Sequence, residues 1–234
     1  NDQIKQLYVD GHFCYVYKIG LVTNGLGIVR HLAFYNKDFS GSHPELIPNK
    51  KSHSPDDDKS IHDARLLIPT LKDFFYAHPL INPRIFLGDA AFDAVNLYKD
   101  LLSGDTFGTD KHFSKTYIPL NTRSHLENRD YIINENGIPC CPHDSKLPMK
   151  PETSHSNLRS GIPTFKFVCP KMTFDKCEDG KYHRCCHCEN PCTSSSSGRM
   201  VYLYPEKDFR ACPGVLRGTP EWNSTYKIRT TVAR

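Results

Sequence analysis

The sequence contains no run of about 18 apolar residues, no strong excess of one charge and no internal repeat. A membrane-spanning helix needs roughly 18 or more such residues in succession, so we expect no membrane partner. Basic residues number 30 and acidic residues 26, a formal net charge of +4. This charge is compatible with a nucleic-acid partner but too small to indicate one by itself. The missing repeat argues against a repeat architecture.

Composition and length are those of a globular protein with one main domain. Of the 234 residues, 38% are hydrophobic and 24% are charged, which is typical of globular chains. At roughly 100 to 200 residues per domain, we expect one core, or one core with an insertion. The sequence begins at Asn1 without Met and ends at Arg234 within a helical pattern. We therefore expect a fragment, and the missing signal peptide does not exclude secretion.

Cysteine is concentrated in one part of the chain. Most of the ten cysteines lie between Cys140 and Cys192, which suits a metal knuckle or reduced thiols better than disulfides spread along a fold. The best set for a tetrahedral zinc ion is Cys188 and Cys192 with two others, chosen from Cys169, Cys177 and Cys185. No regular pair of two-residue spacers is present, so free thiols are favoured over zinc.

The first part of the sequence predicts two strands followed by a helix. The β-prone run Phe13–Val22 predicts a strand that is buried on both faces. Asn24-Gly25 predicts a tight turn with positive φ angles, leading to a second strand over Gly27–Tyr35. A polar loop is expected over Asn36–Ser60, and Pro69 is expected to open a helix.

Asp89 gives the strongest local signal for chemistry. It follows the short predicted strand Ile85–Leu87 and Gly88, and an acid at the carboxyl end of a strand can project into a ligand-binding crevice. Asp89 is therefore a candidate metal ligand, with helix capping as the alternative. Asp93 is expected to cap the helix that follows. A further strand is predicted over Tyr117–Leu120.

The last residues predict a helix with one narrow stripe of side chains. Thr219 is a natural N-cap, and Pro220 suits the first helical position. At 3.6 residues per turn, spacings of four, three and four bring side chains onto one face. This stripe consists of Trp222, Tyr226, Arg229 and Ala233. Trp222 is expected to serve packing.

The order and spacing of these motifs resemble one family. Tyr226-x-x-Arg229, followed by position 233, resembles the Tyr-x-x-Arg-x-x-x-Glu signature of a large group of bacterial insertion-sequence transposases of the DDE type. Three longer segments are also similar to members of that group, and the resemblance covers nearly the whole chain. These segments are His12–Tyr15, Thr23–His31 and Trp222–Arg229.

The resemblance implies an α/β fold, namely an RNase H-like mixed sheet flanked by helices with a Cys-rich irregular insertion before the last helix. It divides the chain into a partial catalytic core (1–121), an insertion (122–219) and the start of a C-terminal core helix (220–234). In this family Asp89 corresponds to a catalytic acid that binds Mg²⁺ or Mn²⁺, and Tyr226 and Arg229 correspond to DNA-binding residues. Such proteins cleave and transfer double-stranded DNA, act as dimers or larger assemblies on it, and work at the nucleoid in the bacterial cytoplasm.

Two departures from the family pattern leave the enzyme question open. Position 233, where the family has a catalytic glutamate, is Ala233, which can neither bind a metal nor accept a proton. The first strand and its aspartate are expected before Asn1, because the hairpin resembles the second and third strands of the fold. Asp10 is the only acid near that place, and we expect it to be a turn residue.

Three functions therefore compete. The chain could belong to a metal-dependent transposase that is inactive as written, or it could be a DNA-binding relic or interaction module that keeps the fold without cutting. A secreted disulfide-rich protein would fit the number of cysteines but not the strand and helix patterns.

Overall fold

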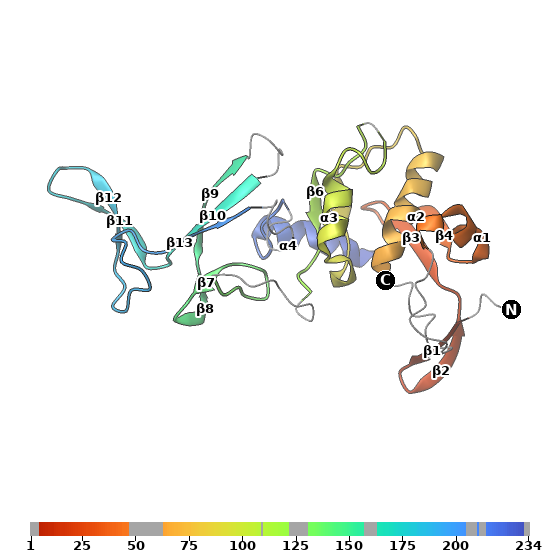
Figure 1. Cartoon of the computed structure of the whole chain (residues 1–234), viewed down its shortest axis with the longest axis horizontal. Coiled ribbons are helices and arrows are strands. Elements are labelled where there is room, and N and C mark those ends of the chain that lie inside the picture. Colours follow the sequence, from red (N-terminus) through yellow and green to blue (C-terminus); the bar gives the residue numbers. More distant parts are fainter. Residues whose placement is uncertain are drawn as a thin grey trace.

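The computed structural model describes residues 5–46, 63–108, 110–121, 131–156, 163–204, 210 and 214–231. It is a mixed α/β structure with several small sheets and an elongated outline (Figure 1). The N-terminal elements and the helices lie at one end, and the strands of the Cys-rich region lie at the other. The last helix, α4 (Pro220–Tyr226), is the exception among the helices and lies between the two ends. None of the helices in these described ranges is long and apolar enough to cross a membrane.

Two hairpins form the first part of the chain. Strands β1 (Lys5–Val9) and β2 (His12–Val16) are joined by a turn at Asp10, which has a positive φ of 49°. Strands β3 (Ile19–Thr23) and β4 (Val29–Phe34) form the second hairpin. Asp10 is thus a turn residue, as expected.

The single doubly buried strand predicted over Phe13–Val22 is wrong in both respects. The run is divided at Tyr17-Lys18 into β2 and β3, and the β1–β2 hairpin projects away from the helices (Figure 1). Phe13 remains 69% exposed and Tyr15 74% exposed. The alternation of apolar residues predicted the strand conformation correctly, but burial depends on neighbouring layers that a local pattern does not contain.

The turn of the second hairpin is organised by Asn24. Its side-chain Oδ1 accepts hydrogen bonds from the backbone N–H groups of Leu26 and Ile28, both at 3.0 Å. The positive φ, 77°, occurs at Gly27 and not at Gly25. The turn is therefore longer than the two-residue turn that Asn24-Gly25 predicted, because the asparagine side chain supplements the backbone hydrogen bonds between Asn24 and Ile28.

Two helices follow the second hairpin, and both differ from what the sequence predicted. The segment predicted as a polar loop begins with a short helix, α1 (Lys37–Ser42), capped by Asn36 and followed by a 3-10 turn at Pro44–Leu46. Helix α2 (Asp63–Ala77) contains Pro69 in its interior, so the expectation that Pro69 opens the helix is wrong. Proline removes one backbone hydrogen bond there, while its ring is buried in the core.

One apolar core joins the two strand pairs. Strand β5 (Ile85–Leu87) is parallel to β6 (Lys115–Tyr117), and helix α3 (Val95–Leu102) packs against β6. Val22 of β3 and Phe86 of β5 both pack on the same cluster of buried side chains, so the two pairs lie on one core although they belong to separate sheets. This cluster contains Leu71, Phe74, Phe75, Tyr98, Leu101, Phe113 and Ile118.

The Cys-rich region has more regular structure than its composition predicted. The antiparallel sheet β13-β10-β9 is built from Met200–Leu203, Pro163–Val168 and Lys150–Ser156, with its own small core around Phe167. Two hairpins accompany it. The first consists of β7 (Cys140–Cys141) and β8 (Asp144–Pro148), and the second of β11 (Met172–Lys176) and β12 (Tyr182–Cys186).

The final helix begins where the sequence predicted. Thr219 accepts a hydrogen bond from the backbone N–H of Trp222 at 3.1 Å, and helix α4 spans Pro220–Tyr226. It continues as a 3-10 helix over Lys227–Thr231, whereas a continuous α-helix was expected. Trp222 is buried with Tyr117 and Val215, which confirms its predicted packing role. Residue 233 lies outside the described residues.

Candidate functional site

Asp89 lies directly after β5 and uses its two carboxylate oxygens differently. Oδ1 accepts a hydrogen bond from the backbone N–H of Ala91 at 2.9 Å, which caps the 3-10 turn Ala90–Phe92. Oδ2 accepts a hydrogen bond from the guanidinium of Arg229 at 3.1 Å. The capping interpretation and the interpretation of Asp89 as a site residue are therefore compatible, because each concerns a different oxygen.

Gly88 fixes the direction in which the chain leaves β5. A Cβ atom at this position would lie 2.8 Å from the ring of Phe86 and 2.9 Å from that of Phe92. No real Cβ tolerates such distances, so the backbone passes between the two rings only because glycine has no side chain. Its N–H donates to the carbonyl of Tyr117 at 3.2 Å. Residue 89 is thereby held at the carboxyl end of the parallel strand pair.

Arg229 reaches Asp89 from the end of the last helix. Tyr226 stacks on Trp222 with ring centroids 4.6 Å apart, and the Arg229 guanidinium lies 6.0 Å from the centre of the Tyr226 ring. Burial raises the pKa of the Tyr226 hydroxyl, while the positive charge of Arg229 opposes this rise. The predicted stripe is therefore present from Trp222 to Arg229, and Arg229 contacts the carboxylate of Asp89.

The hairpin turn at Asn24–Ile28 contacts the same final segment. A Cβ built on Gly25 would lie 3.5 Å from the side chain of Ile228, and one built on Gly27 would lie 3.3 Å from the carbonyl oxygen of Thr231. Three segments that are distant in sequence thus meet here: this turn, the end of β5 and the 3-10 helix. We call Asp89, Tyr226 and Arg229 the Asp89–Arg229 site.

The Asp89–Arg229 site is open to solvent and carries one acid. The side chains of Asp89 and Arg229 are 45% and 38% exposed. A guanidinium has five N–H donors in a planar fork suited to carboxylates and phosphates, so contacts with Asp89 and Tyr226 leave donors for a ligand. A magnesium site needs several oxygen ligands, and the described residues contain no group of three or more acidic, His or Cys side chains that could hold an ion. Asp89 alone does not complete such a site.

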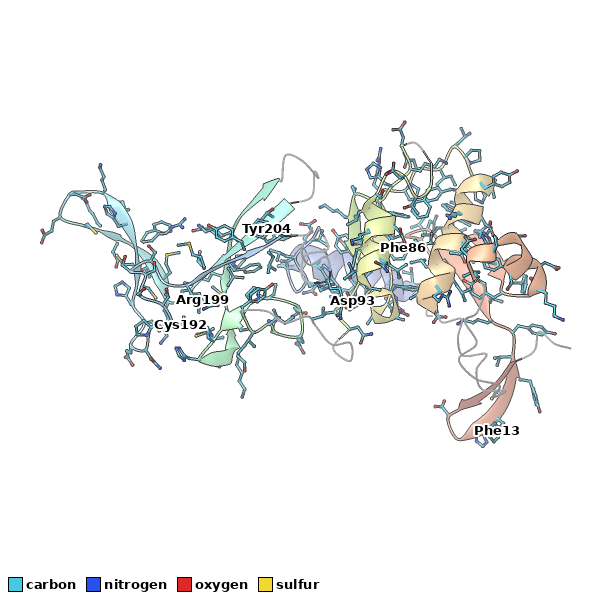
Figure 2. All side chains as sticks on the ribbon, viewed as in Figure 1. Phe13, Phe86, Asp93, Cys192, Arg199 and Tyr204 are labelled. Atoms are coloured by element: carbon cyan, nitrogen blue, oxygen red, sulfur yellow. The ribbon has the colours of Figure 1, made fainter. Side chains whose placement is uncertain are left out.

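Asp93 has a different role from the helix cap that was predicted. Helix α3 has Ala94 at its N-cap and no side-chain cap, while the carboxylate of Asp93 is fully buried between two arginines. Arg210 donates to Oδ2 at 2.8 Å, and Arg217 lies 3.4 Å from Oδ1. The prediction failed because these partners are 117 and 124 positions away. Figure 2 places Asp93 between the helical core and the region that contains α4.

This buried network attaches the end of the insertion to the core. The hydroxyl of Tyr98 donates to Asp93 at 2.8 Å, and the backbone N–H of Asn121 donates to the other carboxylate oxygen at 2.8 Å. Burial raises the pKa of Tyr98 far above its ordinary value, so this hydroxyl stays protonated and remains a donor. The network holds the segment that leads into α4, and thereby helps to position Arg229. Sequence reasoning overlooked Arg210 and Arg217, and no local motif marks them.

Within the described residues no cysteine set, including the one chosen from spacing, is assembled as three or more metal ligands. Instead, the thiol of Cys186, which that set omitted, donates to the sulfur of Cys169 at 3.5 Å. Cys177 and Cys185 interact with each other and with Asp175. Successive residues of a strand point to opposite faces, so Cys185 and Cys186 belong to separate groups.

Comparisons with protein-family models, with curated proteins and with solved structures find no match for this chain.

Proposed function

We propose that this chain is part of the core of a DDE-type transposase, with an RNase H-like fold, and that it binds double-stranded DNA without cleaving it. The observation that carries the proposal is the contact between Arg229 and Asp89. The family resemblance pairs an acid after a core strand with a Tyr-x-x-Arg helix, and these two motifs meet in space although 140 positions separate them.

In this proposal Arg229 binds a DNA phosphate. Its guanidinium is half exposed and oriented by Asp89 and Tyr226, which reduces the entropy lost when it binds a ligand. A planar fork of donors can make two parallel hydrogen bonds to a phosphate. Phosphate contacts of this kind position a protein on DNA without selecting a sequence.

Cleavage would need more carboxylates than Asp89 alone. Two-metal hydrolysis uses Mg²⁺ or Mn²⁺ ions held by several acids. Asp89 would supply one ligand, but the methyl group of Ala233 cannot supply another. We therefore propose that the chain as written keeps DNA binding and has lost strand cleavage and transfer. A homodimer on DNA, in the bacterial cytoplasm, is part of the same proposal.

A second candidate function is cleavage by a parent protein with glutamate at position 233. The test places Ala233→Glu in the full-length protein that the gene encodes and measures nicking of a supercoiled plasmid containing the DNA that flanks the gene. With Mg²⁺ or Mn²⁺, the proposal expects nicking by the restored protein, none by the unaltered protein, and none by the restored protein that also carries Asp89→Asn. Nicking that survives Asp89→Asn, or a folded restored protein that neither binds nor nicks DNA, would remove the transposase proposal.

A further inference from the structure

The β11–β12 hairpin has little apolar support. Most side chains of both strands are exposed or half exposed, and a two-stranded hairpin alone is marginally stable in water. A small cluster, made mostly of sulfur-containing side chains, connects the hairpin to the rest of the insertion. The cluster consists of Val168, Cys169, Met172 and the partly buried Cys186.

Cys169 and Cys186 are held in place by one loop. The backbone N–H of Cys169 donates to the carbonyl of Arg199 at 2.9 Å, and that of Cys186 donates to the carbonyl of Ser196 at 2.8 Å. Gly198, with a φ of 76°, approaches so closely that a Cβ there would lie 2.9 Å from both Cys169 Cβ and Cys186 Sγ. This loop therefore holds the backbone of both residues, and their sulfurs lie 3.5 Å apart.

Two more thiols follow Cys186 in the sequence. The backbone of Cys188 hydrogen-bonds to the sulfur of Cys186, and the thiol of Cys188 donates to the carbonyl of Asn190 at 3.3 Å. Cys192 interacts electrostatically with Cys141 and, less strongly, with Cys169. Figure 2 shows several sulfur atoms, in yellow, near the labelled Cys192 and Arg199.

The neighbouring histidines are engaged elsewhere. His187 Nε2 lies 2.5 Å from the carboxylate of Asp175, and His183 Nε2 lies 2.9 Å from that of Asp179. Both histidines are more than half exposed, whereas Cys169 is buried. The candidate ligands on the inner side of the hairpin are therefore thiols.

We propose that Cys169, Cys186, Cys188 and Cys192 bind one zinc ion that fastens the β11–β12 hairpin to the insertion. Tetrahedral zinc with Zn–S bonds of about 2.3 Å places its sulfurs about 3.8 Å apart, and the pair Cys169–Cys186 is already close to this separation. Cys188 and Cys192 would move in when the ion binds, which couples metal binding to local folding. The spacing of the cysteines had favoured free thiols, because Cys169 and Cys186 come together only through the fold.

A disulfide between Cys169 and Cys186 is the competing explanation. A disulfide would attach the hairpin to the insertion as a zinc ion would. It would use only two of the four thiols, however, and leave Cys188 and Cys192 without a role. Zinc uses all four and leaves each sulfur able to accept backbone hydrogen bonds, of which the Cys188–Cys186 contact is one.

The test uses the whole chain purified in reducing buffer without chelators. We expect native mass spectrometry to show one zinc ion per chain, and replacement by Co²⁺ to give the visible absorption of a tetrahedral thiolate site. Cys169→Ser and Cys186→Ser should abolish both signals. Cys177→Ser and Cys185→Ser, on the other face of the same hairpin, are the matched controls and should keep both.

Far-ultraviolet circular dichroism and hydrogen exchange separate loss of the ion from loss of the fold. The proposal expects exchange to rise in 169–192 of the Cys169→Ser variant while α2 and α3 stay protected. Absence of stoichiometric zinc from the folded protein, equal loss of zinc in the control variants, or a Cys169–Cys186 disulfide in metal-free protein would overturn it.

Discussion

Arg229 donates a hydrogen bond to Oδ2 of Asp89 at 3.1 Å, across 140 positions of sequence. Both side chains are more than a third exposed, and exposed ion pairs contribute only about 0 to 1 kcal/mol to stability. The contact is therefore poorly explained by a need for stability alone. Its position at the end of a parallel strand pair, beside the Tyr226 ring, suits a ligand-binding role better.

The first prediction concerns the energy of this contact. Arg229→Ala should lower the free energy of unfolding by less than about 1 kcal/mol, because water replaces the lost partner of Asp89. Urea denaturation of Arg229→Ala, Asp89→Ala and the double variant would give the coupling energy. A coupling above about 2 kcal/mol would identify the pair as a structural clamp and weaken the DNA-binding proposal.

Asp93 should be far more sensitive than Asp89. Asp93→Ala leaves Arg210 and Arg217 buried without their carboxylate, and breaking such a pair costs about 3 to 5 kcal/mol. The same urea experiment measures this loss. Asp105→Ala, at an exposed position, is the control and should change little. If both variants unfold at the same urea concentration, the buried network does not form.

Gly88→Ala tests the close approach that directs Asp89. The new methyl group would lie 2.8 Å from Phe86 and 2.9 Å from Phe92, and forcing an extra group into a packed core costs about 1 to 3 kcal/mol. Gly104→Ala is the matched control, because nothing lies within 4 Å of its added Cβ. The melting temperature of Gly88→Ala should therefore be clearly lower than that of Gly104→Ala. Equal melting temperatures would contradict the packing described around Gly88.

The insertion should lose stability in acid through Glu152. Its carboxylate lies 2.5 Å from Lys166 Nζ and 2.7 Å from an Arg184 nitrogen, and the hydrogen bond from Lys166 is the main reason that its pKa is lowered. A lowered pKa means that the stabilisation is complete above the ordinary pKa of a glutamate and disappears as the pH falls through the lowered value. Unfolding free energies measured from neutral to acidic pH should decline less steeply for Glu152→Gln. An unchanged slope would show that the two ion pairs do not form.

Local features of the fold and site could be predicted from the sequence. Thr219 and Pro220 marked the start of α4, and Gly88-Asp89 marked the end of a strand, because caps and strand ends depend on a few adjacent residues. The sequence nevertheless predicted an α-helix that is too long, because the segment after Tyr226 is a 3-10 helix.

Long-range relationships could not be predicted in the same way. Asp93 has the spacing of a helix cap, yet its partners Arg210 and Arg217 are brought to it by the return of the chain after the insertion. The set of zinc ligands chosen from spacing omits Cys186, because its contact with Cys169 depends on the turn before β11. Asp89 and Arg229 are 140 positions apart, and only the family resemblance assigns both of them to a functional site.

The salt dependence of DNA binding tests the central claim most directly. The affinity of the unaltered chain and of Arg229→Gln for a short duplex is measured by fluorescence anisotropy over a series of KCl concentrations. Each phosphate contact contributes about 0.9 to the slope of log K against log salt concentration, so the account predicts weaker binding and a slope shallower by about that amount for Arg229→Gln. Arg84→Gln, at the amino end of β5 and away from Asp89, should keep the original slope. Identical slopes for the unaltered chain and Arg229→Gln, or no binding at low salt, would contradict the account.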